Sequence, residues 1–269
     1  MDATLLPAEL AGLLNDAAIE RRPDARLGTE LYHIQDARAQ GYYLKFAPAG
    51  SMEDLDAERQ RLVWLAGRLP VPEVRGWWSD AGGSYLLISE LHGATSSDER
   101  WKNQPRRLIE RIVEGMRTIH AVPLEDCPFR NTLESELREA KRRIEAGEID
   151  RAGFMADAGG RTPEEVYEDL AARKGMIVEN TFTHGDYCMP NIIIDPESIV
   201  GFIDWGIAGS ADPHRDLMAM ADSVSFNLGE EYRALFFEVY GAEQVNHEII
   251  RYYTLLDYYF GHHVVQGTR

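Results

Sequence analysis

Hydrophobic and polar positions follow two different periods along this chain, and the period changes near residue 100. Before that point, short apolar runs bounded by turn residues predict an antiparallel sheet. Apolar residues three or four positions apart predict two helices, the second capped by Ser51 and stopped by Pro70. The expected elements are four strands and two helices: 26–35, 42–47, 74–78 and 85–90, then 5–18 and 51–69. Residues 1 to about 90 should therefore form a small sheet with one inserted helix.

From about residue 105 onward the apolar positions follow helical spacing. The expected helices are 107–120, 133–145, 163–173, 230–240 and 248–260. Thr162 precedes one of them, with a proline at the first turn, which is typical of a helix start. The Gly-rich linker before it is expected to be mobile. One hairpin interrupts the helices, with strands at 191–195 and 199–204 joined by the turn Asp195-Pro196-Glu197-Ser198.

This hairpin carries the chemistry that the sequence predicts. Asn191 begins its first strand and Asp204 ends its second, so antiparallel pairing brings both side chains to one end. Asp186 lies five residues before Asn191. Carboxylate and amide oxygens suit Mg²⁺, and a further carboxylate could accept a proton from an attacking hydroxyl, as phosphoryl transfer requires. Each residue alone is more often a turn residue, but their joint order and spacing favour the functional interpretation.

Bulk composition narrows the function classes. The 269 residues include 45 acidic and 28 basic side chains, for a formal net charge of −17. Such a surface repels phosphodiester backbones and would attract a cationic ligand, although acidity also serves solubility alone. No apolar run is long enough to cross a bilayer, and the start of the chain lacks the basic segment of a secretory signal. Only two cysteines occur, Cys127 and Cys188, and neither has a metal-spaced partner, so we expect a reducing, cytoplasmic location. From the charge and the lack of a long apolar run, we expect neither nucleic-acid nor membrane binding.

The segments THGDYCMPN and GFIDWG resemble the catalytic and metal loops of the aminoglycoside phosphotransferases. That resemblance implies an α+β, protein-kinase-like bilobal fold, with a small antiparallel sheet plus helix in the N-lobe and a mainly helical C-lobe. It implies that Asp186 is the catalytic base and that Asn191 and Asp204 bind Mg²⁺. His184 would hold the loop, and Asp216 would buttress it.

The first half of the chain carries segments that resemble the family's nucleotide-binding residues. Tyr43-Leu44-Lys45 resembles the family's YLK, so Lys45 would contact the α- and β-phosphates, Glu58 would pair with it, and Tyr43 would stack on adenine. Other implied nucleotide contacts come from a hinge and a phosphate-covering loop: Ser89, Leu91, Gly28 and Thr29. No Walker-type GxxxxGK[ST] occurs. Residues 1–91 would form the nucleotide-binding lobe, and residues 92–269 the catalytic and acceptor-binding lobe.

Three further segments resemble the 3′-phosphotransferase branch of that family: Cys127-Pro128-Phe129, 162–170 and 252–260. Members of this branch move a phosphate from ATP, or in some cases GTP, to a ring hydroxyl of kanamycin-like or neomycin-like drugs. The resemblance therefore implies a cationic small-molecule acceptor and a role in antibiotic resistance, with no protein partner. The residues implied at the acceptor are Asp150, Asp157, Asp257 and Tyr258.

Departures from this branch fall in the acceptor-binding half. Apolar or neutral residues stand where the branch has charged ones: Met189, Ile207, Phe226, Asn227 and Tyr258. The chain also continues past Phe260 as residues 261–269, which could fold back into the site. Each buried ammonium group needs a carboxylate partner. A pocket with fewer acids indicates a narrower drug spectrum or a less charged acceptor.

Other functions remain open at this point. The same chemistry could act on a macrolide, a sugar or an amino alcohol, and a nucleotide-binding pseudoenzyme is a further alternative. A protein kinase is disfavoured, because the segment between Asp204 and Asp216 is too short for an activation loop. A metallohydrolase is disfavoured, because His262 and His263 lack metal-ligand spacing.

Overall fold

The computed structural model describes residues 7–14, 17–23, 28–51 and 53–261, which form two compact units. Unit 1 comprises Met1–Ser96 and Pro190–Ile207, and unit 2 comprises Ser97–Met189 and Ala208–Arg269. The catalytic hairpin predicted from the sequence therefore packs with the N-terminal part of the chain. A functional division between residues 91 and 92 stays a prediction.

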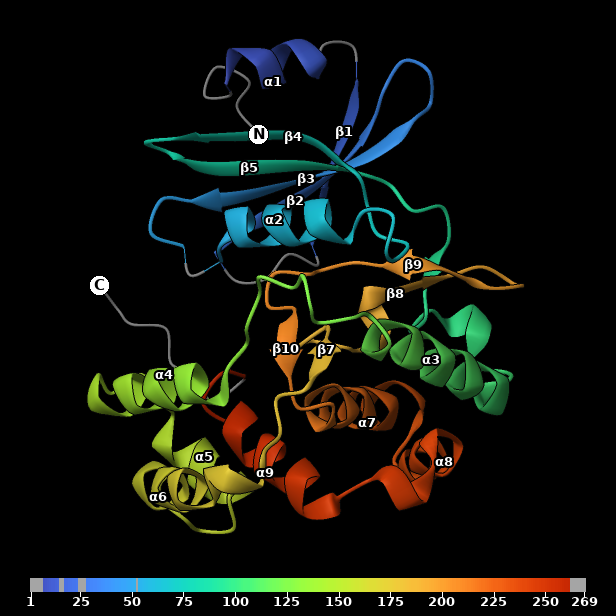
Figure 1. The fold of residues 1–269 in the computed structure, drawn as a ribbon. Helices are drawn as coiled ribbons and strands as arrows, with labels where there is room; N and C mark the ends of the chain where they lie inside the picture. Colours follow the sequence, from blue (N-terminus) through green and yellow to red (C-terminus); the bar gives the residue numbers. More distant parts are fainter. Residues whose placement is uncertain (1–6, 15–16, 24–27, 52, 262–269) are drawn as a thin grey trace. The chain divides into compact units, whose positions relative to one another are not determined.

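Unit 1 is built on a five-stranded antiparallel sheet of order β1-β2-β3-β5-β4, with two helices (Figure 1). Its elements are α1 (Ala8–Leu13), β1 (Ala18–Arg22), β2 (Glu30–Gln35), β3 (Gly41–Pro48), α2 (Leu55–Leu65), β4 (Val74–Asp80) and β5 (Gly83–Ser89). Side chains alternate between the faces of β3. Leu44 is buried in a core that includes Leu10 of α1. The next residue, Lys45, contacts Glu58 of α2. The two helices thus cover opposite faces of the sheet.

A second, three-stranded sheet completes unit 1. It has the order β6-β8-β9, formed by β6 (Ala94–Thr95), β8 (Ile192–Ile194) and β9 (Ile199–Phe202). Phe202 N–H donates to Pro70 O at 3.0 Å, and an added Cβ at Gly201 would come 2.6 Å from the same oxygen. Only glycine allows this close approach, which ties β9 to the segment that follows α2.

Unit 2 is mainly helical. Its elements are α3 (Pro105–His120), α4 (Leu133–Glu145), α5 (Arg151–Asp157), α6 (Pro163–Arg173), β7 (Thr181–Thr183), β10 (Gly209–Ala211), α7 (His214–Leu228), α8 (Glu231–Tyr240) and α9 (His247–Asp257). Short 3₁₀ turns lie at Glu99–Trp101, Lys174–Met176 and Ala242–Gln244, and a further turn, Met189–Asn191, lies where the chain passes from unit 2 into unit 1. α7 packs on α8 and α9, and β7 pairs with β10 antiparallel. These two short strands bracket the segment that contains Asp186.

Most predicted elements are present, and the following expectations were wrong. Of the helix expected at 5–18, residues 7–14 and 17–18 are described: α1 covers Ala8–Leu13, and Ala18 already belongs to the separate strand β1, which pairs with β2. The helix cap is Asp54 instead of Ser51, since the Asp54 carboxylate accepts from two backbone N–H groups of the first turn. That helix ends at Leu65, before Pro70. The Gly-rich linker contains a helix, α5.

Two expectations fall partly or wholly outside the described residues. The strand expected at 26–35 is described only from Glu30, because residues 24–27 are not described. The C-terminal extension is described only to Gly261, so His262 and His263 lie outside it. By contrast, Thr162 forms the predicted helix start, as a capping box in which its hydroxyl accepts from Glu165 N–H at 3.2 Å.

Candidate active site

A lysine with two acidic partners forms the centre of the site in unit 1. Lys45 lies on β3, and its Nζ donates to both carboxylate oxygens of Glu58 on α2 at 2.8 Å. The same ammonium contacts Asp204, which follows β9. The structure thus brings together three residues that are far apart in the sequence. The predicted Lys45–Glu58 pair is present, while its phosphate-binding role stays a prediction.

Burial makes this triangle electrostatically strong. The side chains of Lys45 and Glu58 are 13% and 3% exposed. Burial alone would lower the pKa of Lys45, but the carboxylates of Asp204 and Glu58 raise it well above its usual range. Burial raises the pKa of Glu58, and the ammonium of Lys45 opposes that rise. A lysine that is protonated at neutral pH and held by two acids is a preorganised group for an anion.

Asn191 and Asp204 meet at one end of the β8–β9 hairpin. Ile192 pairs with Phe202, and Ile203 N–H donates to Asn191 O at 3.0 Å, so the ends of the hairpin lie side by side. Asp204 has a φ of 64°, a left-handed conformation that few residues other than glycine adopt. Held strain of this kind is often found at functional sites. The donor set of one amide oxygen and one carboxylate matches what Mg²⁺ prefers in proteins.

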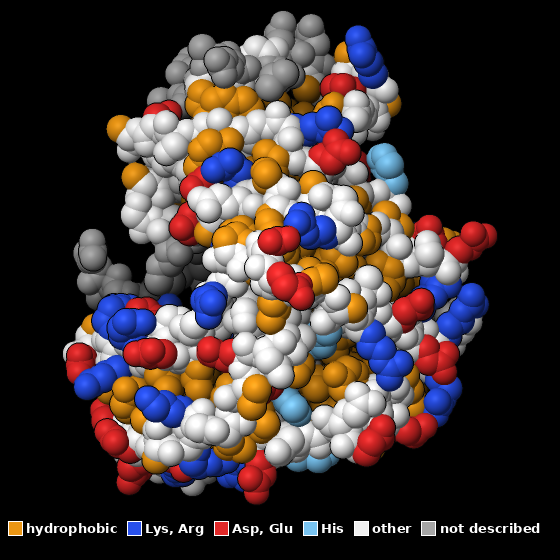
Figure 2. Space-filling model, in the orientation of Figure 1, with side chains coloured by type: hydrophobic (Ala, Val, Ile, Leu, Met, Phe, Trp, Pro, Cys, Tyr) orange, Lys and Arg blue, Asp and Glu red, His pale blue; other side chains and the backbone are white. Residues whose placement is uncertain are grey.

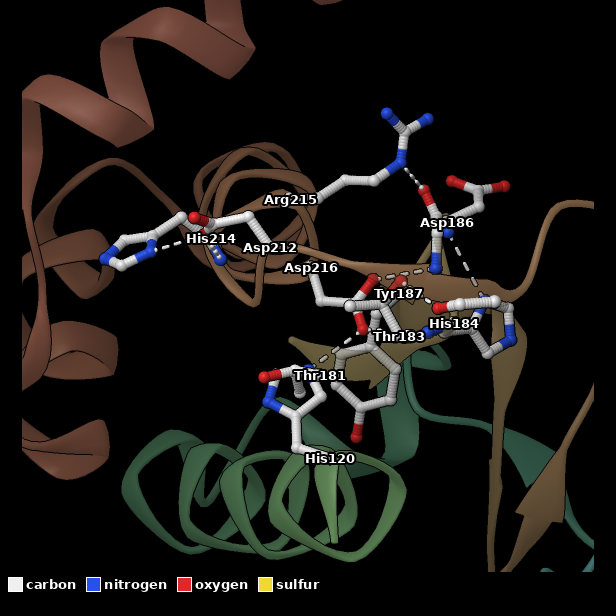
Figure 3. Close-up of polar contacts among 12 residues, drawn as sticks. His120, Thr181, Thr183, His184, Asp186, Tyr187, Asp212, His214, Arg215 and Asp216 are labelled. Carbon is white, nitrogen blue, oxygen red and sulfur yellow. Dashed lines mark hydrogen bonds and ion pairs between the residues drawn. The ribbon is translucent and has the colours of Figure 1, made fainter. Parts of the chain in front are cut away.

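The segment around Asp186 lies in unit 2 and is held through its backbone (Figure 3). The carboxylate of Asp216, on α7, accepts from His184 N–H at 2.9 Å and from Gly185 N–H at 2.8 Å. Asp186 N–H donates to His184 Nδ1 at 3.4 Å. His184 and Asp216 are fully buried, whereas Asp186 is partly exposed. Asp186 thus lies on a loop whose backbone is held by a side chain of α7.

His120, at the end of α3, is a third partner of Asp216, and the sequence did not reveal it. Its Nε2 lies 3.0 Å from Asp216 Oδ2. Burial alone would raise the pKa of Asp216, but the hydrogen bond from His120 and the contacts with His184 outweigh burial and lower that pKa. Asp216 is therefore held as a carboxylate at neutral pH. Because 96 residues separate the pair, no local pattern could have identified His120.

Other side chains around the loop also escaped the sequence analysis. Ser223 Oγ accepts from Met189 N–H at 2.9 Å, which fixes the far end of the loop on α7. Arg215 Nε donates to Gly185 O at 3.0 Å, and the same guanidinium is paired with Glu136 of α4. Arg215 is adjacent to the predicted Asp216 in sequence, but an arginine at a helix start is not in itself a functional signal.

The predicted nucleotide residues of unit 1 lie on or beside the sheet. Tyr43 is partly exposed on β3, with its ring centroid 5.0 Å from that of His33 on β2. Ser89 is the last residue of β5, where its hydroxyl accepts from the backbone N–H of Glu73. Leu91 lies just beyond the last cross-strand contact, Glu90 N–H to Gly41 O at 3.1 Å. Two loop residues precede β2: Gly28, with φ of 90°, and Thr29.

The Glu90 side chain crosses β3 to reach His33. Its Oε2 lies 3.1 Å from His33 Nε2. A Cβ added at Gly41 would come 1.6 Å from that carboxylate oxygen, so the crossing requires a glycine at this position of β3. This contact fixes the residue between Ser89 and Leu91.

Two of the predicted acceptor residues meet in unit 2. Tyr258 packs edge-on against Phe154, and its hydroxyl is 3.5 Å from the backbone oxygen of Asp157 at the end of α5. Asp150 is the N-cap of α5: its carboxylate accepts from Ala152 N–H and so stabilises the start of the helix. Asp257 ends α9 and is exposed.

Acidic and basic side chains are interspersed over the visible surface of unit 2 rather than segregated by sign (Figure 2). Several acids near the helices already have cationic partners, among them Asp222 with Arg233 and Glu164 with Arg151. Within the described part of the chain, no helix combines the length and apolar character needed to cross a membrane.

Comparisons with known proteins agree with the predicted fold and family. Residues 22–253 match the phosphotransferase enzyme family. An aminoglycoside 3′-phosphotransferase from Niallia circulans is 36% identical over 255 residues, covering 94% of this chain and 97% of the relative. A streptomycin 3″-kinase from Streptomyces griseus is 30% identical over 86% of this chain and 88% of the relative.

Solved structures give the same result. The crystal structure of an aminoglycoside 3′-phosphotransferase of type VIII superposes with a TM-score of 0.81 at 26% identity, covering 94% of this chain and 97% of that one. An aminoglycoside phosphotransferase from Streptomyces rimosus, in complex with ADP and streptomycin, superposes with a TM-score of 0.74 at 26% identity, covering 96% and 98%. The kinase-like α+β fold predicted from the sequence is confirmed.

Proposed function

The chain belongs to the phosphotransferase enzyme family and is a phosphotransferase, and from this premise we propose that it phosphorylates a hydroxyl group of an aminoglycoside, with ATP as the donor. The observation that carries the proposal is the contact of the largely buried Lys45 with Glu58 and with the partly exposed Asp204, combined with a loop that presents Asp186. The aminoglycoside phosphotransferase from Streptomyces rimosus, crystallised with ADP, supports the choice of an adenine nucleotide. No observation favours GTP.

Lys45 would bind the phosphates of the nucleotide. It is protonated at neutral pH, because two carboxylates outweigh the effect of burial and raise its pKa. Glu58 keeps the ammonium in place through two hydrogen bonds, so little reorganisation is needed when an anion arrives. Phosphoryl transfer depends on positioning and on stabilising the charge of the transferred group, and Lys45 contributes to both.

The oxygens of Asn191 and Asp204 fit Mg²⁺, and we assign them as its ligands. Their hairpin holds both residues at one end, and the donor set is of the hard oxygen type. When bound, the ion neutralises charge that develops on the phosphate oxygens. Asp204 lies two residues past β9 in a left-handed conformation, and its carboxylate contacts Lys45.

The nucleotide base would lie against the hinge. Ser89 and Leu91 flank Glu90, whose side chain is fixed on His33, and their backbone groups would read the adenine edge. Tyr43 would stack on the ring from β3. Gly28 and Thr29 would cover the phosphates from the loop that leads into β2.

Asp186 would act as the catalytic base. It would accept the proton of the acceptor hydroxyl as the oxygen attacks the terminal phosphorus, while the bond to the departing diphosphate breaks. Asp216 and His184 would keep the loop in position through the backbone bonds described above. The convergence of Asp186 with Asn191 and Asp204 stays a prediction, as does the cytoplasmic location.

The acceptor would be recognised by unit 2. Asp157 at the end of α5, Asp257 at the end of α9 and Tyr258, the residue after it, would make ammonium and ring contacts, with Asp150 at the start of α5. One observation favours a less cationic acceptor. The Phe226 side chain is 89% exposed on α7, one helical turn beyond Ser223, which anchors the catalytic loop. An exposed phenyl ring one helical turn from the residue that anchors the loop suits an apolar contact, as a macrolide would offer.

A phosphorylation screen tests the proposal. Purified protein, MgATP and one acceptor at a time (kanamycin, neomycin, streptomycin and erythromycin) would be followed by ADP release and by mass spectrometry. We expect a mass gain of one phosphate on at least one aminoglycoside, and a loss of about 100-fold or more in kcat for Asp186→Asn. Transfer to erythromycin alone would favour the macrolide alternative. MgATP binding without transfer to any acceptor would instead favour a pseudoenzyme.

A further inference from the structure

Gly185 is held from both sides by two consecutive residues of α7. Its N–H donates to Asp216 Oδ1 at 2.8 Å, and its carbonyl accepts from Arg215 Nε at 3.0 Å. With φ of 86°, Gly185 occupies a conformation that other residues rarely adopt. Figure 3 shows the Arg215 side chain reaching from α7 to the backbone beside Asp186.

The carbonyl of Gly185 belongs to the peptide group that leads into Asp186. The N–H of the same peptide group points to His184 Nδ1. Because a peptide group is planar, fixing its oxygen and its N–H fixes the plane of the group and, with it, the direction of the N–Cα bond of Asp186. A glycine on one side of this group makes a flip of the peptide sterically easy, so an external restraint on the oxygen has a clear purpose.

The restraint is itself held from another helix. The Arg215 guanidinium pairs with Glu136 of α4, and their side chains are only 15% and 10% exposed. Burial raises the pKa of Glu136, and Arg215 opposes that rise. Asp257 and Glu179 lie close enough to Arg215 or Glu136 to interact electrostatically. A planar guanidinium can bind the carboxylate and the carbonyl at once, which an ammonium group cannot do in the same geometry.

We propose that Arg215, held by Glu136, is a positioning residue that sets the orientation of the Gly185–Asp186 peptide and thereby of Asp186. The pair thus connects α4 to the catalytic loop, independently of the buttress that Asp216 provides. The inference deepens the proposed function, because it assigns Arg215 a role in the same reaction. If Arg215 and Glu136 only joined α4 to α7, loss of the hydrogen bond from Arg215 Nε to Gly185 O would not affect Asp186.

Hydrogen exchange tests the role without an acceptor. The intact chain would be compared as wild type, Arg215→Lys, Glu136→Gln and Arg233→Lys, with mass spectrometry of peptides that span residues 182–189. Arg233→Lys is the matched control, because Arg233 lies on α8 and its ion pair with Asp222 of α7 lies outside the loop. We expect exchange at Gly185 and Asp186 to rise roughly tenfold in the first two variants and not in the control. Equal exchange in all four proteins would overturn the proposal.

Kinetics give the second readout. With MgATP and kanamycin, Arg215→Lys should lower kcat by about tenfold or more while the KM for ATP stays unchanged, since only the base is displaced. A rise in KM for ATP with normal kcat would refute a positioning role. If Arg215→Lys does not fold, Glu136→Gln carries the same comparison. A wild type inactive on kanamycin would count against that acceptor, and the exchange result would still decide the role of Arg215.

Discussion

Asp216→Asn is the sharpest test of how the loop around Asp186 is held. The carboxylate accepts from His184 N–H, from Gly185 N–H and from His120 Nε2, at 2.8–3.0 Å, and is fully buried. An asparagine has the same shape but offers one oxygen and one NH₂ group. In either orientation, the NH₂ group must face at least one backbone N–H donor.

The cost can be worked out from these contacts. At least one charge-assisted hydrogen bond is lost, worth about 1.5–3 kcal/mol, and two donors are left facing each other in the interior. The surviving bonds also weaken, because charge-assisted bonds are roughly twice as strong as neutral ones. We therefore expect a loss of about 3–5 kcal/mol in the free energy of unfolding, which is the range for breaking a buried charged contact. Because domains typically have free energies of unfolding of about 5–15 kcal/mol, the variant should still fold at low temperature.

Urea unfolding followed by far-UV circular dichroism measures the effect, because α7 belongs to the helical unit 2. Asp222→Asn on the same helix is the control, since Asp222 is about half exposed and should cost less than about 1 kcal/mol. A loss below 1 kcal/mol for Asp216→Asn would refute the reasoning.

The pH dependence supplies a second check on Asp216. Its pKa is lowered in the folded state, so its contribution is fully present above the unfolded value of about 3.9 and declines as pH falls through the folded value. The stability difference between wild type and Asp216→Asn should thus be constant from pH 7 to about 5 and shrink below about 4. A difference that does not change between pH 7 and 3 would contradict the assignment.

Three further outcomes are expected. Gly41→Ala should destabilise unit 1 by about 1–3 kcal/mol and reduce the rise in Tm that MgATP causes, because the new Cβ displaces the Glu90 carboxylate; an unaltered Tm in both conditions would contradict this. Lys45→Met should cost about 3–5 kcal/mol in urea unfolding by leaving Glu58 buried and unpaired, and adding Glu58→Gln should recover part of the loss; a double variant weaker than the single one would speak against that cause. Thr162→Ala should lower the free energy of unfolding by about 1 kcal/mol, with Thr162→Ser close to wild type; equal losses in both would argue against the capping box.

Local patterns predicted much of the fold because local physics decides it. The helices α4 and α6 begin and end where their periodicity indicates, and Thr162 caps α6 as predicted. The β8–β9 hairpin likewise follows from two apolar runs and a turn. β1 was missed because its sequence carries no strand pattern of its own. Its pairing with β2 decides the structure, and pairing is a tertiary contact.

The candidate site divides in the same way. Lys45 and Asp204 could be named from motifs, and Glu58 from the order in which its helix follows the lysine strand. The partners that hold the loop could not. His120, Arg215 and Glu136 come from three helices, and each is an ordinary polar residue in its local sequence. Only the folded chain shows that these residues share partners, because long-range contacts leave no periodic trace in one sequence.

The motif His184-Gly185-Asp186 illustrates why a recognisable sequence motif does not reveal the contacts that position it. α7 contacts it mainly through backbone groups, namely two N–H groups and one carbonyl, and these groups are the same for every residue type except proline. What the sequence must supply is a backbone able to present them, and the positive φ of Gly185 explains why a glycine stands there. The matching acceptor and donor on α7, Asp216 and Arg215, are one residue apart. The position of Asp186 is thus set less by its own neighbours in the motif than by two side chains some thirty residues away.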